Sequence, residues 1–180
     1  MENRKILTAV KNILPLSLIV LSAVLSRTLP HPPNFAPITG IALFSGSYLS
    51  GFRAFLLTLG IMFLSDLYIG FHSTIIYVYG SFFLIVCLGK FLQKKNSFIS
   101  LAATSFSSSL IFFVITNFGV WLSGGLYAKD LEGLQQSYIM ALPFLKNTLA
   151  GDFFYTFLLF YGFQFLTLLI NRVVFVNKTS

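Results

Sequence analysis

Residues 52–69 read FRAFLLTLGIMFLSDLYI, an apolar run of 18 residues with Arg53 at its start and Asp66 near its end. About 20 consecutive apolar residues form a helix long enough to cross the hydrocarbon core of a bilayer. An ionised side chain inside such a helix is costly unless it faces protein, water or a ligand. The run therefore predicts a membrane-spanning helix with a polar site near its second end.

The composition of the whole chain agrees with a membrane protein. Hydrophobic residues make up 56% and charged residues 9% of its 180 residues, whereas soluble domains carry about 25% charged residues. The net charge of +7 comes from Lys and Arg at the ends of apolar runs, so it indicates topology rather than a nucleic-acid partner. The single cysteine, Cys87, excludes an internal disulfide and any multi-cysteine metal site.

The chain contains further apolar segments besides this run. Together they predict an all-α fold, a six-helix transmembrane bundle that occupies residues 1–180 as a single integral membrane domain. The basic, apolar N-terminus continues to Leu29, so we expect a retained first span rather than a cleaved signal peptide. The short second segment is tilted, shielded by its neighbours or partly re-entrant. Pro143 is expected to end a short interfacial helix before the last span. The expected segments are 7–29, 37–49, 52–69, 74–92, 98–122 and 147–170.

The distribution of positive charge predicts the orientation. Lys and Arg concentrate before the first segment, between the second and third, after the fourth and after the sixth. Cytoplasmic loops carry an excess of these residues, so both termini are expected in the cytoplasm. On the opposite, outer side fall the strongly polar residues that lie at or near the ends of the apolar runs. We predict a ligand site there, formed by His31, Asn34, Asp66, Asn117, Trp121, Asn147 and Asp152.

The loop from His31 to Pro37 lies on the predicted outer side and contains three prolines. Proline restricts the backbone and removes hydrogen-bond donors, so the segment is stiff. It acts either as a lid that contacts a ligand or only as a rigid turn between two helices. Ligand contacts often lie on such loops.

The two membrane-embedded carboxylates, Asp66 and Asp152, need polar partners. Each is expected either to form a buried ion pair that joins two helices or to hydrogen-bond a polar ligand. Asn117 and Trp121 are four residues apart on one helix face, where they either contact a ring-containing ligand or serve as a cap and an interfacial anchor. His72 is expected at the interface, and Lys146 is expected to extend to the lipid headgroups.

The inner half of the predicted bundle has almost no ionisable residues between its ends. A continuous proton or ion relay would need polar groups through the full depth of the membrane. A site confined to the outer half instead suits the capture of a small-molecule solute. No cofactor and no metal site are expected, because two histidines without a fixed helical spacing are a poor metal signal.

Five stretches carry a resemblance to a known family: Ser26–Ile38, Ala42–Gly46, Ser65–Asp66, Thr116–Trp121 and Pro143–Asp152. Together they resemble an uncharacterised bacterial membrane-protein family related to the substrate-binding (S) components of energy-coupling-factor vitamin transporters. The resemblance covers nearly the whole chain, and the proline-rich loop is its most specific part. One departure concerns docking, because S components use Ala-x-x-x-Ala in the first helix and the nearest match here is Ser22–Ser26.

This resemblance implies a six-helix fold in the bacterial cytoplasmic membrane, with a micronutrient site on the outer side capped by the loop after the first helix. It also implies an ATP-driven partner, a transmembrane coupling protein with two ATPases, which topples the S component to release the substrate. The resemblance does not imply a particular substrate, because relatives bind chemically diverse vitamins and metals.

Two other functions remain as alternatives. A non-catalytic scaffold or accessory protein would use its polar residues only to join helices. An intramembrane enzyme would use Asp66 and Asp152 as a catalytic pair, which requires the two carboxylates to approach closely. Aspartyl intramembrane proteases carry Gly-x-Gly-Asp, whereas Leu149–Asp152 lacks the first glycine and the chain is short for that class. We therefore expect a binding protein and not an enzyme.

Overall fold

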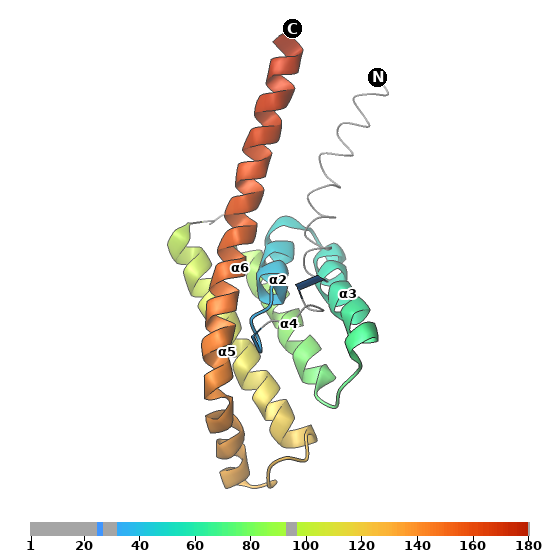
Figure 1. Ribbon diagram of the computed structural model, residues 1–180, viewed down its shortest axis with the longest axis vertical. Coiled ribbons are helices and arrows are strands. Elements are labelled where there is room, and N and C mark those ends of the chain that lie inside the picture. Colours follow the sequence, from blue (N-terminus) through green and yellow to red (C-terminus); the bar gives the residue numbers. More distant parts are fainter. Residues whose placement is uncertain (1–24, 27–31, 93–96, 180) are drawn as a thin grey trace.

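The computed structural model describes residues 25–26, 32–92 and 97–179, with side chains as far as residue 169. The described residues contain no strand, so the all-α prediction is confirmed for this part of the chain. They form five α-helices rather than six, and the predicted first span, 7–29, lies outside them except for Leu25 and Ser26. The elements are α2 (Ile38–Tyr48), α3 (Phe52–Ile69), α4 (Ile75–Gly89), the 3-10 helix η1 (Lys90–Leu92), α5 (Phe98–Ser123) and α6 (Leu131–Thr179) (Figure 1).

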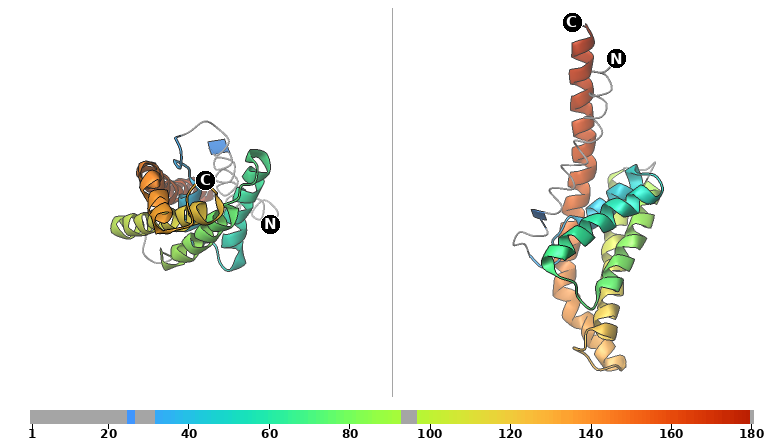
Figure 2. Two further views of the ribbon diagram at one scale, coloured as in Figure 1. Left: turned by 90° about the horizontal axis from the view of Figure 1, so that it is seen from below. Right: turned by 90° about the vertical axis from the view of Figure 1, so that its right-hand side faces the viewer.

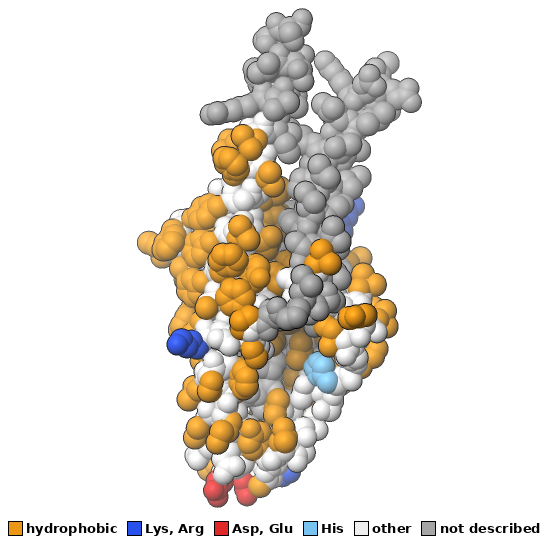
Figure 3. Space-filling model, viewed as in Figure 1, with side chains coloured by type: hydrophobic (Ala, Val, Ile, Leu, Met, Phe, Trp, Pro, Cys, Tyr) orange, Lys and Arg blue, Asp and Glu red, His pale blue; other side chains and the backbone are white. Residues whose placement is uncertain are grey.

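Four helical segments are long and apolar enough to cross a membrane. They are α3, α4 together with η1, α5, and the Leu131–Leu169 part of α6. Many large apolar side chains on them point outward, including Leu64 and Leu158, and apolar atoms dominate the surface in Figure 3. A water-soluble protein rarely exposes such continuous apolar area. The chain is therefore a multi-pass membrane protein.

Helix α2 lies inside the bundle. Its 11 residues extend about 16 Å at 1.5 Å per residue, well short of the roughly 30 Å hydrocarbon core. Nine of the 11, Ile38–Gly46, are buried, because α2 contacts α3, α4, α5 and α6. Of the three arrangements that the sequence left open, the structure therefore has the helix shielded by its neighbours (Figures 1 and 2).

Glycine allows α2 and α4 to approach closely. A Cβ atom added to Gly46 would lie 2.1 Å from the Val86 carbonyl oxygen, and one added to Gly89 would lie 2.5 Å from that of Leu43. Small residues permit such contact between membrane helices. This contact holds α2 inside the bundle, where it forms one wall of the polar site described below.

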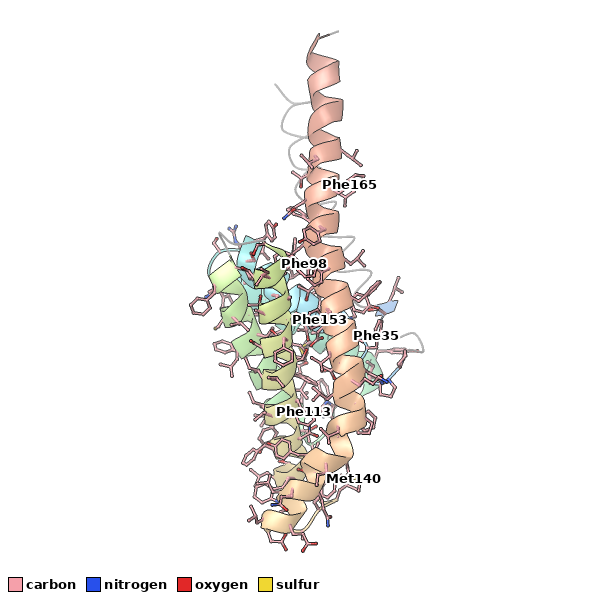
Figure 4. The ribbon with its side chains drawn as sticks, turned by 90° about the vertical axis from the view of Figure 1, so that its left-hand side faces the viewer. Phe35, Phe98, Phe113, Met140, Phe153 and Phe165 are labelled. Carbon is pink, nitrogen blue, oxygen red and sulfur yellow. The ribbon has the colours of Figure 1, made fainter. Side chains whose placement is uncertain are left out.

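The prediction for Pro143 is wrong. Helix α6 is continuous from Leu131 to Thr179 with Pro143 inside it, so no separate interfacial helix precedes the last span. Proline removes one backbone hydrogen bond and bends a helix, and α6 changes direction in its first part (Figure 4). Neighbouring groups can compensate for that missing bond in a membrane bundle, so proline need not end the helix.

Candidate functional site

The proline-rich loop rests on α6. The Phe35 ring lies 6.0 Å from the ring of Phe154 and 5.5 Å from that of Tyr155, centroid to centroid. Gly151 lies directly beneath it, since a Cβ atom there would be 3.0 Å from the Phe35 Cα. Figure 4 shows Phe35 beside α6. The described part of the loop, residues 32–37, is thus packed against the last helix.

Asn34 is the one described non-glycine residue with a left-handed backbone, at φ 63°. Asparagine tolerates this conformation better than most residues. The turn is closed by the Phe35 N–H, which donates to the Pro32 carbonyl at 3.0 Å. Asn34 lines two adjoining cavities beneath the loop, which are described next.

The larger cavity has a volume of about 210 Å³ and lies between α4, α5 and the first half of α6. Its walls are mostly aromatic and aliphatic, with neutral polar groups from the loop, α5 and α6. Phe113 on α5 faces α6, where its ring lies 5.7 Å from that of Tyr138 (Figure 4). The lining residues are Asn34, Val78, Phe112, Phe113, Thr116, Asn117, Val120, Ala141, Phe144 and Thr148.

A smaller cavity of about 40 Å³ adjoins the larger one. The two share three lining residues, Asn34, Phe112 and Thr148. The smaller cavity also reaches Thr39 on α2, Phe82 on α4 and Asp152 on α6. The carboxylate therefore lies beside the smaller cavity, with α2 as one wall.

Asp152 is 1% exposed, and both partners of its carboxylate in the described part of the chain are hydroxyl groups. The Ser109 hydroxyl donates to Oδ2 at 2.6 Å, and the Thr39 side chain supplies a second hydrogen bond. These bonds join α6 to α5 and to α2. Of the cations available for an ion pair, Lys146 and His72 are exposed, and Arg27 and His31 lie outside the described residues.

Buried hydroxyl groups also lie one helical turn further along both α5 and α6. Ser105 precedes Ser109 by four residues, and Thr156 follows Asp152 by four. Both hydroxyls are fully buried and find no hydrogen-bond partner among the described residues. Residues four apart share a helix face, so Asp152 belongs to a polar stripe and not to an isolated position.

Asp66 has different surroundings. It is 2% exposed and lines neither cavity. Its Oδ2 accepts a hydrogen bond from the Tyr79 hydroxyl at 2.8 Å, which joins α3 to α4. The hydrogen bonds of Asp66 and Asp152 thus lead to different helices, and the structure does not bring Asp66 into the site beside Asp152.

Asn117 and Trp121 share a face of α5 but not a role. Asn117 lines the larger cavity, and its Nδ2 donates to the Phe113 carbonyl at 2.8 Å. The Trp121 indole N–H instead donates to the Ala128 carbonyl at 2.9 Å, and Lys129 donates to the Trp121 carbonyl. Trp121 therefore forms hydrogen bonds within the connection between α5 and α6, and it lines neither cavity.

The other predicted residues contribute little to this geometry. His31 lies outside the described residues, and Asn147 is half-buried but lines neither cavity. His72 is exposed and bonds to the Thr74 hydroxyl at 2.8 Å. Of the predicted ligand contacts, the cavities bring together Asn34, Asn117 and Asp152.

Residues that the sequence did not single out as ligand contacts complete the walls. The hydroxyls are Thr39, Thr116 and Thr148, and the rings include Phe82 and Phe112. Ser109 donates to Asp152 but lines neither cavity. Thr148 precedes Asp152 by four residues, so a systematic search for hydroxyls on the faces of Asp152 and Asn117 would have found Thr148. The Phe residues carry no such signal, because the chain has 22 of them.

The fold and the cavities define a class: a helical multi-pass membrane protein with a polar site enclosed between helices and a loop. Residues 8–173 match the model of a family of unknown function, DUF6580, so the chain belongs to that family. Comparison with curated proteins and with solved structures finds no significant match.

Proposed function

We propose that the protein is a substrate-binding membrane protein of a micronutrient uptake system, similar to the S components of energy-coupling-factor transporters, and not an enzyme. The solute occupies the two joined cavities beneath residues 32–37. The observation that carries the proposal is the convergence of Asn34, Asn117 and Asp152, from a loop and two helices, on two adjoining cavities. A concave, mostly apolar pocket with a few convergent polar groups is typical of small-molecule sites.

The distribution of charge supports an outward-facing site in the bacterial cytoplasmic membrane. Arg53 and Lys90 flank one end of the pair α3 and α4, whereas Asp130 and Glu132 lie with Lys129 at the connection of α5 and α6. Figure 3 shows acidic side chains at the lower end of the molecule. Basic connections face the cytoplasm. In this orientation the proline-rich loop opens to the outside and both termini lie in the cytoplasm.

Release of the solute into the cell requires a partner. The cavities lie in the half of the bundle toward the α5–α6 connection, so the solute has no short path to the other side. We propose an ATP-driven module of a transmembrane coupling protein and ATPases as that partner, and the resemblance of the sequence to S components supports it.

The scaffold alternative is favoured by one specific observation. The buried hydrogen bond Ser109–Asp152 and the partly buried one Tyr79–Asp66 join helices, as a purely structural protein would need. They do not account for the adjoining cavities, because a structural pair is best packed without empty space around it.

Mass spectrometry of small molecules released from the purified full-length protein tests the proposal. In Ala141→Phe a ring fills the larger cavity, since Ala141 is buried in its wall. Leu142→Phe is the matched control, because Leu142 is the next residue and is exposed. We expect a compound that the wild type and Leu142→Phe retain and that Ala141→Phe loses. Folded, monodisperse wild-type protein without any bound compound would contradict solute binding and favour the scaffold.

A further inference from the structure

The smaller cavity combines a buried carboxylate with two aromatic rings. Phe82 and Phe112 line it together with Asp152, and their ring centroids lie 5.3 Å apart at an interplanar angle of 45°. The faces of aromatic rings attract cations, and aromatic cages bind ammonium groups in this way. A carboxylate beside two rings is therefore suited to a positively charged group.

The charges around the cavities also favour a positively charged ligand. In the part of the chain that the structure describes, no Lys, Arg or His lines either cavity. Ser109 and Thr39 give Asp152 hydrogen bonds but no opposite charge. A carboxylate taken out of water is costly unless it is paired, and a cationic ligand would supply that missing charge.

The lining and the volume of the larger cavity indicate the chemical nature of the rest of the ligand. Phe112, Phe113 and Phe144 supply rings, while Thr116 and Asn117 supply neutral polar groups. Its volume of about 210 Å³ is below the roughly 300 Å³ at which pockets for drug-sized molecules begin. A single ring fits this description better than a fused or macrocyclic cofactor. Because Phe112 borders both cavities, one molecule can occupy them together.

We propose that the solute is a small organic cation, with one aromatic or heteroaromatic ring in the larger cavity and a protonated amine in the smaller one, facing Asp152. This inference rests on the proposed function, because it assigns the chemical class of the same bound solute. Asp152 and the ring faces of Phe82 and Phe112 hold the charged end. Asn117 and Thr116 contact the edge of the ring.

Three probes of matched size test the proposal: benzylamine, benzyl alcohol and benzoate, which carry a positive, a neutral and a negative end. Each is titrated by ligand-observed NMR against the full-length protein in lipid nanodiscs, with Ala141→Phe as the blocked control. We expect wild-type protein to bind benzylamine about tenfold or more tightly than benzyl alcohol, because hydrogen bonds to charged groups are the stronger ones. Benzoate should bind most weakly.

Two variants assign any preference to the smaller cavity. Asp152→Asn keeps the shape and removes the charge, so benzylamine should lose its advantage over benzyl alcohol. Phe82→Leu should reduce the advantage by about threefold, in line with a partly buried cation–π contact, and it serves as the test if Asp152→Asn does not fold.

The outcomes separate this inference from the proposed function. Wild-type protein that binds benzyl alcohol or benzoate as well as benzylamine overturns the cationic class, while a bound solute would still be established. Binding of none of the three overturns the single-ring cation, and the proposed function then depends only on the mass-spectrometry result. A co-purified compound without positive charge, lost from Ala141→Phe, would likewise leave the function standing and refute the class.

Discussion

Asp66 and Asp152 are the two buried carboxylates of the described bundle, and they differ in what surrounds them. Asp66, 2% exposed, accepts a hydrogen bond from Tyr79 and lines neither of the two cavities described above. Asp152, 1% exposed, is held by hydroxyls and borders a cavity that continues into a larger one. Burial alone therefore does not distinguish a structural carboxylate from a binding one. The adjoining cavity does.

The largest effect is expected from removing the charge of Asp152. Asp152→Asn should weaken retention of the bound compound by about 10- to 100-fold, since hydrogen bonds to charged groups contribute about 1.5–3 kcal/mol. Asp66→Asn is the matched control and should retain the compound. Affinity of the purified variants for the co-purified compound measures both. Equal losses in the two variants would remove the distinction between the carboxylates.

Tyr79→Phe should have the opposite effect to Asp152→Asn: it should lower the stability of the protein and leave its affinity for the compound unchanged. It removes the hydroxyl that donates to Asp66 and leaves a buried acceptor with a lost partner, at a cost of about 1–3 kcal/mol in the free energy of unfolding. Affinity for the bound compound should not change. Thermal unfolding in detergent, with and without the compound, tests this expectation, which a loss of affinity without loss of stability would contradict.

Asn34 shows whether the loop belongs to the Asp152 site. Asn34→Gly keeps the left-handed turn at φ 63°, whereas Asn34→Ala also strains it by about 1–2 kcal/mol. If the amide contacts the solute, both variants should lose about three- to tenfold in affinity, as expected for one hydrogen bond. Full affinity of the glycine variant would limit Asn34 to a role in the turn.

The smallest difference is expected between two asparagines. Asn117 lines the larger cavity and Asn147 does not. Asn117→Ala should reduce affinity by about two- to fivefold, because a neutral hydrogen bond in the lower part of the usual range contributes about 0.5–1 kcal/mol. Asn147→Ala should have no measurable effect. Titration of both variants in parallel checks the pair, and a larger loss for Asn147→Ala would show that the site extends beyond the two cavities.

Local signals in the sequence were sufficient for much of the fold. The apolar run 52–69 coincides with α3, which lies between glycines with positive φ, Gly51 at 60° and Gly70 at 102°. The prediction for Pro143 is wrong for a physical reason. The local cost of proline in a helix is known, but a sequence does not show the tertiary contacts that allow α6 to continue. The same limit applies to α2, whose short length was plain while its position inside the bundle was not.

The sequence alone determined that this is a helical membrane protein with costly polar residues at the ends of its spans, because apolar length and charge are properties of consecutive residues. Only the tertiary structure decided that Asn34, Asn117 and Asp152 meet at one pair of cavities while Asp66 and Trp121 bond elsewhere. The physical reason is that a side chain's partners depend on how each helix is rotated and how deeply it lies. Packing between helices sets both, through contacts such as Gly46 against Val86.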